Sequence, residues 1–132
     1  IESAWNEAPE LNLSIYLGAP ATATPPNLLL REDSPCPLGM DWRMLHVPGH
    51  SPGSLAFLHT PTETLIAGDT LFAGSMGRVD FPTSDPEAMK VSLSKLMRLS
   101  DATSVHPGHG PSTSIGHERV NNPFLPDGVP TF

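Results

Sequence analysis

Three glycine-containing turns, two of them also containing proline, constrain this chain more than any other feature of its sequence. Each turn adjoins a short apolar run and carries one side chain that can bind a metal: His50, Asp69 or His109. The turns lie at residues 47–54, 67–70 and 106–110. A residue held in so stiff a turn has little conformational entropy left to lose on coordination. The sequence therefore predicts a site assembled from turns at strand ends.

The apolar runs beside these turns predict short strands. Residues 42–47 predict one strand, and the runs at 55–58 and 64–67, separated by a turn that contains Pro61, predict a hairpin. A further brief strand is expected at residues 103–106. Strands of this length with few polar residues indicate a sheet that is mostly buried.

Two helices are expected beside these strands. Residues 84–87 open the first, because they combine a capping side chain with a proline and an acid in the first turn. Its apolar stripe is predicted to face the core and consists of Met89, Leu93, Leu96 and Met97. A shorter helix is expected at residues 114–121, ahead of Pro123. Together with the strands, this order predicts an α/β (α+β) fold, in which helices flank a mixed sheet and the site lies along one sheet edge.

The first forty residues give a weaker pattern. Residues 1–18 are expected to be partly helical, residues 21–24 to form a short strand, and residues 24–40 to form a loop. Within that loop, residues 28–30 are expected to act as an apolar plug, with a binding lip as the alternative. Proline supplies 16 of the 132 residues, whereas about 5% is usual. Loops and turns therefore take much of the chain.

Charge and cysteine content narrow the possible partners. The formal net charge is −7 and no cluster of Lys or Arg is present, so neither nucleic acid nor an anionic membrane is an expected partner. The lone Cys36 excludes an internal disulfide and a zinc site made of cysteines. No leader peptide or apolar run of membrane-spanning length is present, and the expected compartment is the cytoplasm.

Three chemical interpretations compete at this stage. The first is a metal site made of His50, Asp69 and His109, since imidazole and carboxylate suit zinc, iron or manganese. The second is a serine hydrolase, because Ser51 lies in a G-x-S-x-G pattern, but the Pro and Gly that follow block the helix that such a nucleophile requires. The third is a non-catalytic fragment or interaction module.

Four segments in this order resemble the metallo-β-lactamase superfamily and, within it, the glyoxalase II-like hydrolases. They are residues 47–54 (VPGHSPGS), 68–82 (GDTLFAGSMGRVDFP), 106–113 (HPGHGPST) and 118–124 (ERVNNPF). The resemblance extends from about Pro9 to Phe124. It implies an αββα sandwich with a two-metal site, and thioesters such as acylglutathione as the substrate class.

The resemblance also implies a role for each candidate residue. His50 would bind the first metal, His109 the second, and Asp69 would bridge the two as the catalytic carboxylate. The two divalent metals are expected to be zinc, with iron or manganese as alternatives, and a hydroxide that bridges them would attack the substrate carbonyl. Arg78 and Asp80 resemble a Gly-Arg-x-Asp element that supports the site by an ion pair or hydrogen bonds.

A weaker supporting role is assigned to Thr113 and Glu118, which are expected to hydrogen-bond near the metal ligands. The remaining histidines are interpreted as structural, and they are His46, His59, His106 and His117.

One departure from the family pattern limits what this chain can do alone. The H-x-H-x-D-H motif that supplies most of the other ligands in the family does not occur in the sequence. Residues 1–132 are therefore expected to be a partial domain that lacks the first metal motif and the N-terminal β-layer and is inactive without that segment. A mononuclear iron enzyme similar to the persulfide dioxygenases is the alternative function.

Overall fold

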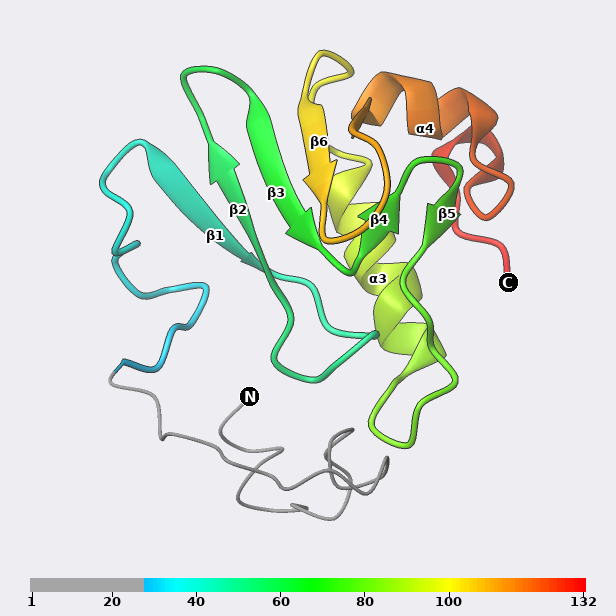
Figure 1. Ribbon diagram of the computed structural model, residues 1–132, viewed down its shortest axis with the longest axis horizontal. Helices are drawn as coiled ribbons and strands as arrows, with labels where there is room; N and C mark the ends of the chain where they lie inside the picture. The colour runs from blue at the N-terminus through cyan, green and yellow to red at the C-terminus, as the bar shows by residue number, and fades with distance from the viewer. Residues whose placement is uncertain (1–27) are drawn as a thin grey trace.

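The computed structural model describes residues 28–132, so the helix expected at residues 1–18 and the strand expected at residues 21–24 lie outside the described part. A five-stranded mixed sheet has the strand order β1-β2-β3-β6-β7 (Figure 1). Its strands are β1 (Trp42–His46), β2 (Leu55–His59), β3 (Thr64–Gly68), β6 (Ser104–Pro107) and β7 (Thr113–Ser114). The other elements are the hairpin of β4 (Leu71–Phe72) and β5 (Ser75–Met76), the helices α3 (Pro86–Leu96) and α4 (Ile115–Asn121), and the 3-10 helix η2 (Pro126–Gly128). The expected mixed sheet with flanking helices is confirmed.

Strand direction brings three chain segments to one edge of the sheet. β1 pairs antiparallel with β2, β2 pairs antiparallel with β3, and β3 pairs parallel with β6. β1, β3 and β6 therefore run the same way, as their arrowheads in Figure 1 show. The turns that follow these three strands leave the sheet at the same edge, which is where the metal-capable side chains were expected.

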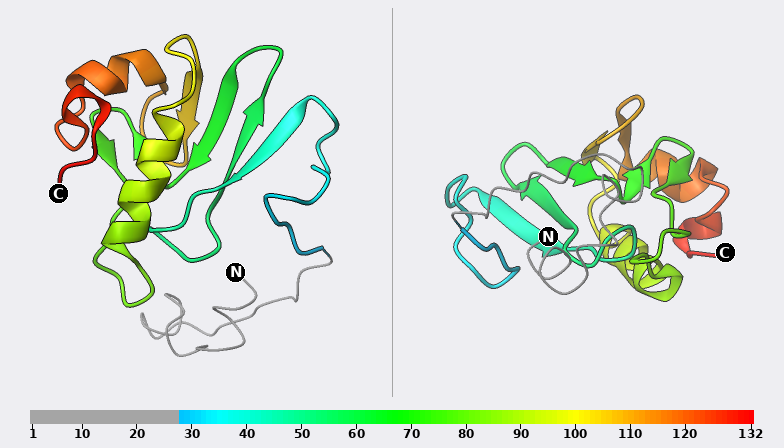
Figure 2. Two further views of the ribbon diagram at one scale, coloured as in Figure 1. Left: turned by 180° about the vertical axis from the view of Figure 1, so that it is seen from behind. Right: turned by 60° about the horizontal axis from the view of Figure 1, so that its bottom comes forward.

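Helix α3 covers one face of the sheet (Figure 2). Asp85 caps it by accepting hydrogen bonds from the backbone N–H groups of Glu87 and Ala88 at 2.9 and 3.0 Å, as the residues at its start predict. The predicted apolar stripe is buried. The core that it joins consists of Leu45, Val47, Ala56, Leu58, Leu65, Ala67, Leu71, Met89, Leu93, Leu96, Met97, Val105, Ile115 and Leu125.

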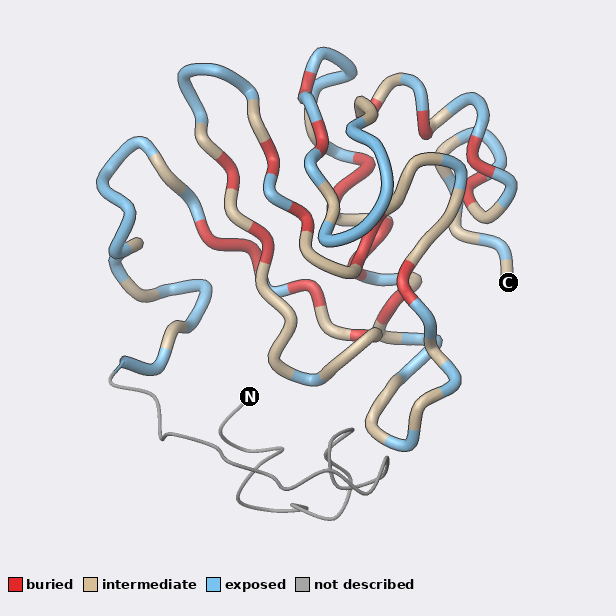
Figure 3. The backbone as a smooth tube through the Cα atoms, in the orientation of Figure 1, coloured by how far each residue is buried: buried red, intermediate tan, exposed pale blue. Residues whose placement is uncertain are grey.

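The other face of the sheet carries a row of three apolar side chains that ends at a histidine. Met44, Phe57, Ile66 and His106 are partners across four adjacent strands, so their side chains point to the same side. Ile66 is 44% exposed. Burial consequently alternates along β2 and β3, as Figure 3 shows.

Two features differ from the sequence-based expectations. The plug predicted at residues 28–30 is wrong, because Leu28 and Leu29 are 63% and 52% exposed. The strands β4, β5 and β7 were not predicted, because each is only two residues long and too short to show an alternating pattern. No helix among residues 28–132 is long and apolar enough to cross a membrane.

The backbone conformation of Gly49, the residue before His50, leads to a prediction about stability. Its φ of +141° is rare for residues with a side chain, and a Cβ there would lie 2.6 Å from the Cα of Met89 on α3. Gly39→Ala is a matched control, because Gly39 has a φ of +115° but nothing within 4 Å. We expect Gly49→Ala to lower the free energy of unfolding by about 2 kcal/mol more than the control does. Urea denaturation measures this, and equal losses would contradict it.

Candidate metal centre

Asp69 stands between two imidazole rings at the edge of the sheet. It follows β3 directly, while His50 lies in the turn after β1 and His109 in the turn after β6. Asp69 Oδ2 is 3.6 Å from His50 Nε2, and Asp69 Oδ1 is 2.9 Å from His109 Nδ1. Each carboxylate oxygen thus faces a different histidine. The structure brings together the three side chains that the sequence singled out.

The backbone determines how His50 presents its ring. His50 Nδ1 lies 2.9 Å from the carbonyl oxygen of Arg78, which only accepts hydrogen bonds. Nδ1 therefore carries a proton, and Nε2 is the ring nitrogen that faces Asp69. Ser84 Oγ donates to the carbonyl of His50 at 2.8 Å. A metal-binding histidine normally has one ring nitrogen donating to a carbonyl or carboxylate, as Nδ1 of His50 does here.

Two glycines allow the chain to close around Asp69. A Cβ on Gly108 would overlap Asp69 Oδ1, and a Cβ on Gly77 would overlap the carbonyl oxygen of Asp69. The N–H of Gly108 also donates to the carbonyl of Gly68 at 2.8 Å, which ties the turn after β6 to the end of β3. Only glycine fits at these two close approaches.

The donor set is suited to divalent metals but is small. Nitrogen and carboxylate oxygen donors match zinc, iron and manganese. Within residues 28–132, however, no three His, Cys, Asp or Glu side chains are placed to hold one metal ion. The described residues offer one imidazole and one carboxylate oxygen on each side of Asp69, whereas a catalytic zinc usually has three protein ligands. His50, Asp69 and His109 therefore fit part of the ligand set of a two-metal site.

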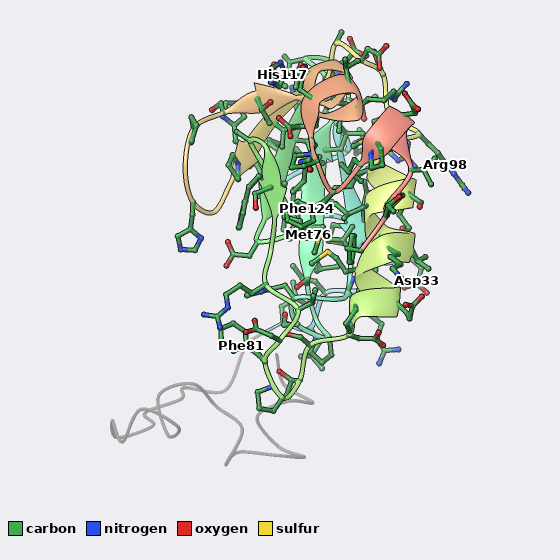
Figure 4. The ribbon with its side chains drawn as sticks, turned by 90° about the vertical axis from the view of Figure 1, so that its right-hand side faces the viewer. Asp33, Met76, Phe81, Arg98, His117 and Phe124 are labelled. Carbon is green, nitrogen blue, oxygen red and sulfur yellow. The ribbon has the colours of Figure 1, made fainter. Side chains whose placement is uncertain are left out.

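Arg78 and Asp80 form an ion pair on the loop whose carbonyl contacts His50. The guanidinium donates to both carboxylate oxygens of Asp80, at 2.8 and 2.7 Å. Arg78 also stacks over the ring of Phe81 at 4.5 Å, and the Phe81 ring lies edge-on to His50 at 5.7 Å. Figure 4 shows Phe81 on the loop between β5 and α3, at the lower end of the molecule. Arg78 thus contributes its backbone carbonyl to His50 and its side chain to Asp80 and Phe81.

This ion pair makes a pH-dependent prediction. Hydrogen bonding from Arg78 lowers the pKa of Asp80, so the pair stabilises the fold above the unfolded carboxyl pKa and is lost as pH falls through the folded one. We expect Arg78→Met to raise the Asp80 pKa toward its ordinary value. Carboxyl ¹³C NMR titration measures this, with Lys90→Met as a control at a distant ion pair. An Asp80 pKa that is the same with and without Arg78 would contradict it.

Thr113 bonds to α4 rather than to a metal-capable side chain in the turns. Its hydroxyl donates to Glu118 Oε1 at 2.5 Å. Ser51, the nucleophile of the serine hydrolase interpretation, hydrogen-bonds the hydroxyl of Ser54 at 2.8 Å. It is followed by β2 rather than by a helix, so this interpretation lacks its expected geometry.

The four remaining histidines have partners away from Asp69. His46 pairs with the carbonyl of Pro52, His59 with Thr62, His106 with Ser112, and His117 with Asn121. Figure 4 shows His117 at the end of the molecule opposite Phe81.

Two aromatic residues near the site were missed by the analysis of the sequence. Phe72 lies edge-on to His109, with ring centroids 6.0 Å apart, and Phe81 contacts His50 as described above. Their contacts join residues more than thirty positions apart, so no local pattern could have revealed them.

Comparison with known protein families gives a clear match. The model of the metallo-beta-lactamase superfamily matches residues 5–109. The hydroxyacylglutathione hydrolase GloC of Haemophilus influenzae is 42% identical over 88 residues, which are 66% of this chain and 42% of the relative. A probable metallo-hydrolase of Streptococcus pyogenes is 38% identical over 131 residues, covering 94% of this chain and 56% of the relative.

Solved structures agree with these relatives. The structure of BLEG-1 B3 metallo-beta-lactamase matches with a TM-score of 0.83 and 40% identity, over 95% of this chain and 62% of that one. TTHA1623 in a di-iron-bound form matches with a TM-score of 0.76 and 41% identity, over 86% of this chain and 56% of that one. The chain thus spans about half the length of the relatives that it matches. By sequence and by fold, it belongs to the metallo-beta-lactamase superfamily.

Proposed function

We propose that this chain is the part of a metal-dependent hydrolase that carries His50, Asp69 and His109. The observation that supports it most strongly is the carboxylate of Asp69, whose two oxygens each face one imidazole at 3.6 and 2.9 Å. A carboxylate in this position can serve two cations at once. The substrate class that we propose is thioesters such as acylglutathione, in line with the similarity to a protein named hydroxyacylglutathione hydrolase.

In this proposal, His50 and Asp69 hold one cation, and His109 and Asp69 hold the other. Bound divalent metals acidify water and polarise carbonyl groups, which is the chemistry that thioester hydrolysis requires. Zinc is the proposed metal, because imidazole and carboxylate are common zinc ligands. The di-iron-bound structure of a similar protein supports iron as the alternative.

We further propose that residues 1–132 act together with an upstream segment of a longer protein. Each cation would have two protein ligands from the described residues, which is fewer than a catalytic site usually has. The sheet face with Phe57 and Ile66 is apolar and partly exposed, as a surface that packs against a second sheet would be. The match with this chain also covers only 42% and 56% of the length of two similar proteins. The upstream segment would supply the missing ligands and cover this face.

The proposed partners and compartment follow from charge and chemistry. A small thioester is the proposed substrate, and the net charge of −7 favours neither nucleic acid nor anionic membranes as partners. The cytoplasm is the proposed compartment.

Metal content and substrate turnover of the longer protein test the function. We expect two divalent cations per chain and hydrolysis of a hydroxyacylglutathione thioester. One iron per chain, with oxygen uptake on a glutathione persulfide, would favour a dioxygenase instead. Neither bound metal nor turnover would favour a non-catalytic module and overturn the proposal.

A further inference from the structure

Glu118 is a buried carboxylate with three hydrogen-bond donors around it. Its side chain lies in α4 and is fully buried. Oε1 accepts from the hydroxyl of Thr113 at 2.5 Å, and Oε2 accepts from the N–H of Gly74 and from Asn122 Nδ2, both at 2.8 Å. Buried carboxylates are rare unless they are satisfied in this way. Its three donors come from different segments, so Glu118 joins these segments; we call Glu118 with Gly74, Thr113 and Asn122 the junction.

Two of these donors belong to the segments that carry the candidate ligands. Gly74 forms the turn of the β4–β5 hairpin, five residues after Asp69. Thr113 lies in β7, four residues after His109. One carboxylate therefore links the chain that continues from Asp69 to the chain that continues from His109.

The hairpin connects this junction to the metal centre. β4 begins two residues after Asp69, and β5 ends two residues before Arg78, whose carbonyl orients His50. Phe72, in β4, lies edge-on to the ring of His109. Asn122 holds the hairpin from the same helix, because its Nδ2 also donates to the carbonyl of Ser75 at 3.0 Å. A shift of the hairpin would move both ends of the site.

We propose that Glu118 is a positioning residue, which fixes His109 and Phe72 relative to Asp69 by holding the hairpin and β7 together. Any effect of Glu118 on catalysis rests on the proposed function. Its hold on the hairpin and β7 does not depend on a bound metal. Glu118 does not contact His50, Asp69 or His109 in the hydrogen bonds of the described residues. It acts through Gly74 and Thr113.

The chemistry of the junction predicts which substitutions it tolerates. Glu118→Gln keeps an oxygen that accepts from Gly74 and Asn122, and its amide nitrogen can donate to the hydroxyl oxygen of Thr113. Glu118→Leu has a similar size but accepts nothing, so the N–H of Gly74 loses its acceptor. Thr113→Val breaks only the link to β7.

NMR on the longer protein, prepared without metal, tests the proposal without turnover. Two readouts report the junction: the hydrogen-exchange rate of the Gly74 amide, and the nuclear Overhauser contacts between the rings of Phe72 and His109. We expect Glu118→Leu to accelerate exchange at Gly74 by about ten-fold or more and to remove the ring contacts. Glu118→Gln should restore both. Thr113→Val should weaken the ring contacts and leave the Gly74 exchange rate near that of the unsubstituted chain.

Arg119→Met is the matched control, because Arg119 is the next residue on α4 but donates to the carbonyls of Met97 and Leu99 instead. It should lower the unfolding midpoint and leave both readouts unchanged. Intact ring contacts in a folded Glu118→Leu variant would overturn the proposal. If that variant does not fold, unchanged ring contacts in Thr113→Val would overturn it.

Turnover in the longer protein then separates the two proposals. If Glu118 positions the site of a hydrolase, Glu118→Leu should lower kcat about ten-fold or more with little change in KM, and Glu118→Gln should restore it. NMR changes as expected in a protein without hydrolase activity would leave the positioning role intact and overturn only the proposed function.

Discussion

Asp69→Asn in the longer protein is expected to remove both cations and abolish thioester hydrolysis. The two oxygens of Asp69 face different imidazoles, so one substitution affects both halves of the site. Asparagine keeps the size of the side chain but replaces one acceptor oxygen with an NH₂ group and removes the negative charge between the cations. We expect kcat/KM to fall by about 10³-fold or more.

Metal analysis and kinetics of the purified variant check this result. Asp101→Asn is a suitable control, because Asp101 is exposed, pairs with Arg119 and forms no ion pair with either histidine. We expect the control to keep two cations and most of its activity. Two cations and near-normal turnover in Asp69→Asn would show that this carboxylate does not bridge a metal pair.

The 132-residue chain on its own is expected to hydrolyse no thioester at an enzymatic rate. Its described residues supply two protein ligands on each side of Asp69, and no three of them hold one metal ion. The affinity of this chain for zinc should therefore be low, and it should offer the substrate no complete metal site. Restoring the upstream segment should recover both affinity and turnover, because the remaining ligands would come with it.

Isothermal titration with zinc, alongside a thioester assay, compares the two lengths of chain. His50→Ala in the longer protein is the companion variant and should abolish turnover again. Enzymatic turnover by the 132-residue chain would contradict the expectation, as would a longer protein that binds zinc no better.

The parts of the fold that could be predicted carry short sequence patterns within a single element or turn. Asp85 and Pro86 mark the start of α3, and the spacing of Met89 and Leu93 indicates its buried face. The three turns with metal-capable residues follow strands that run the same way, so their meeting at one edge is a consequence of sheet topology. The start of α3 and its apolar stripe depend on residues that are close in sequence.

Contacts between distant segments account for what could not be predicted. The sequence suggested a weak supporting role for Glu118, but it did not reveal the contact with Gly74, which lies 44 positions away. The hairpin of β4 and β5 depends on that same contact. Leu28 and Leu29 show the opposite error, since an apolar run suggested burial and the structure exposes it. Burial depends on what the rest of the chain places nearby.

Locating the bound metals in crystals of the longer protein would test the central claim most directly. Anomalous scattering recorded at the absorption edge of the bound metal places each cation without assumptions about its ligands. We predict two peaks on either side of the Asp69 carboxylate, with His50 on one and His109 on the other. A single peak, or two peaks of which neither touches Asp69, would contradict the account.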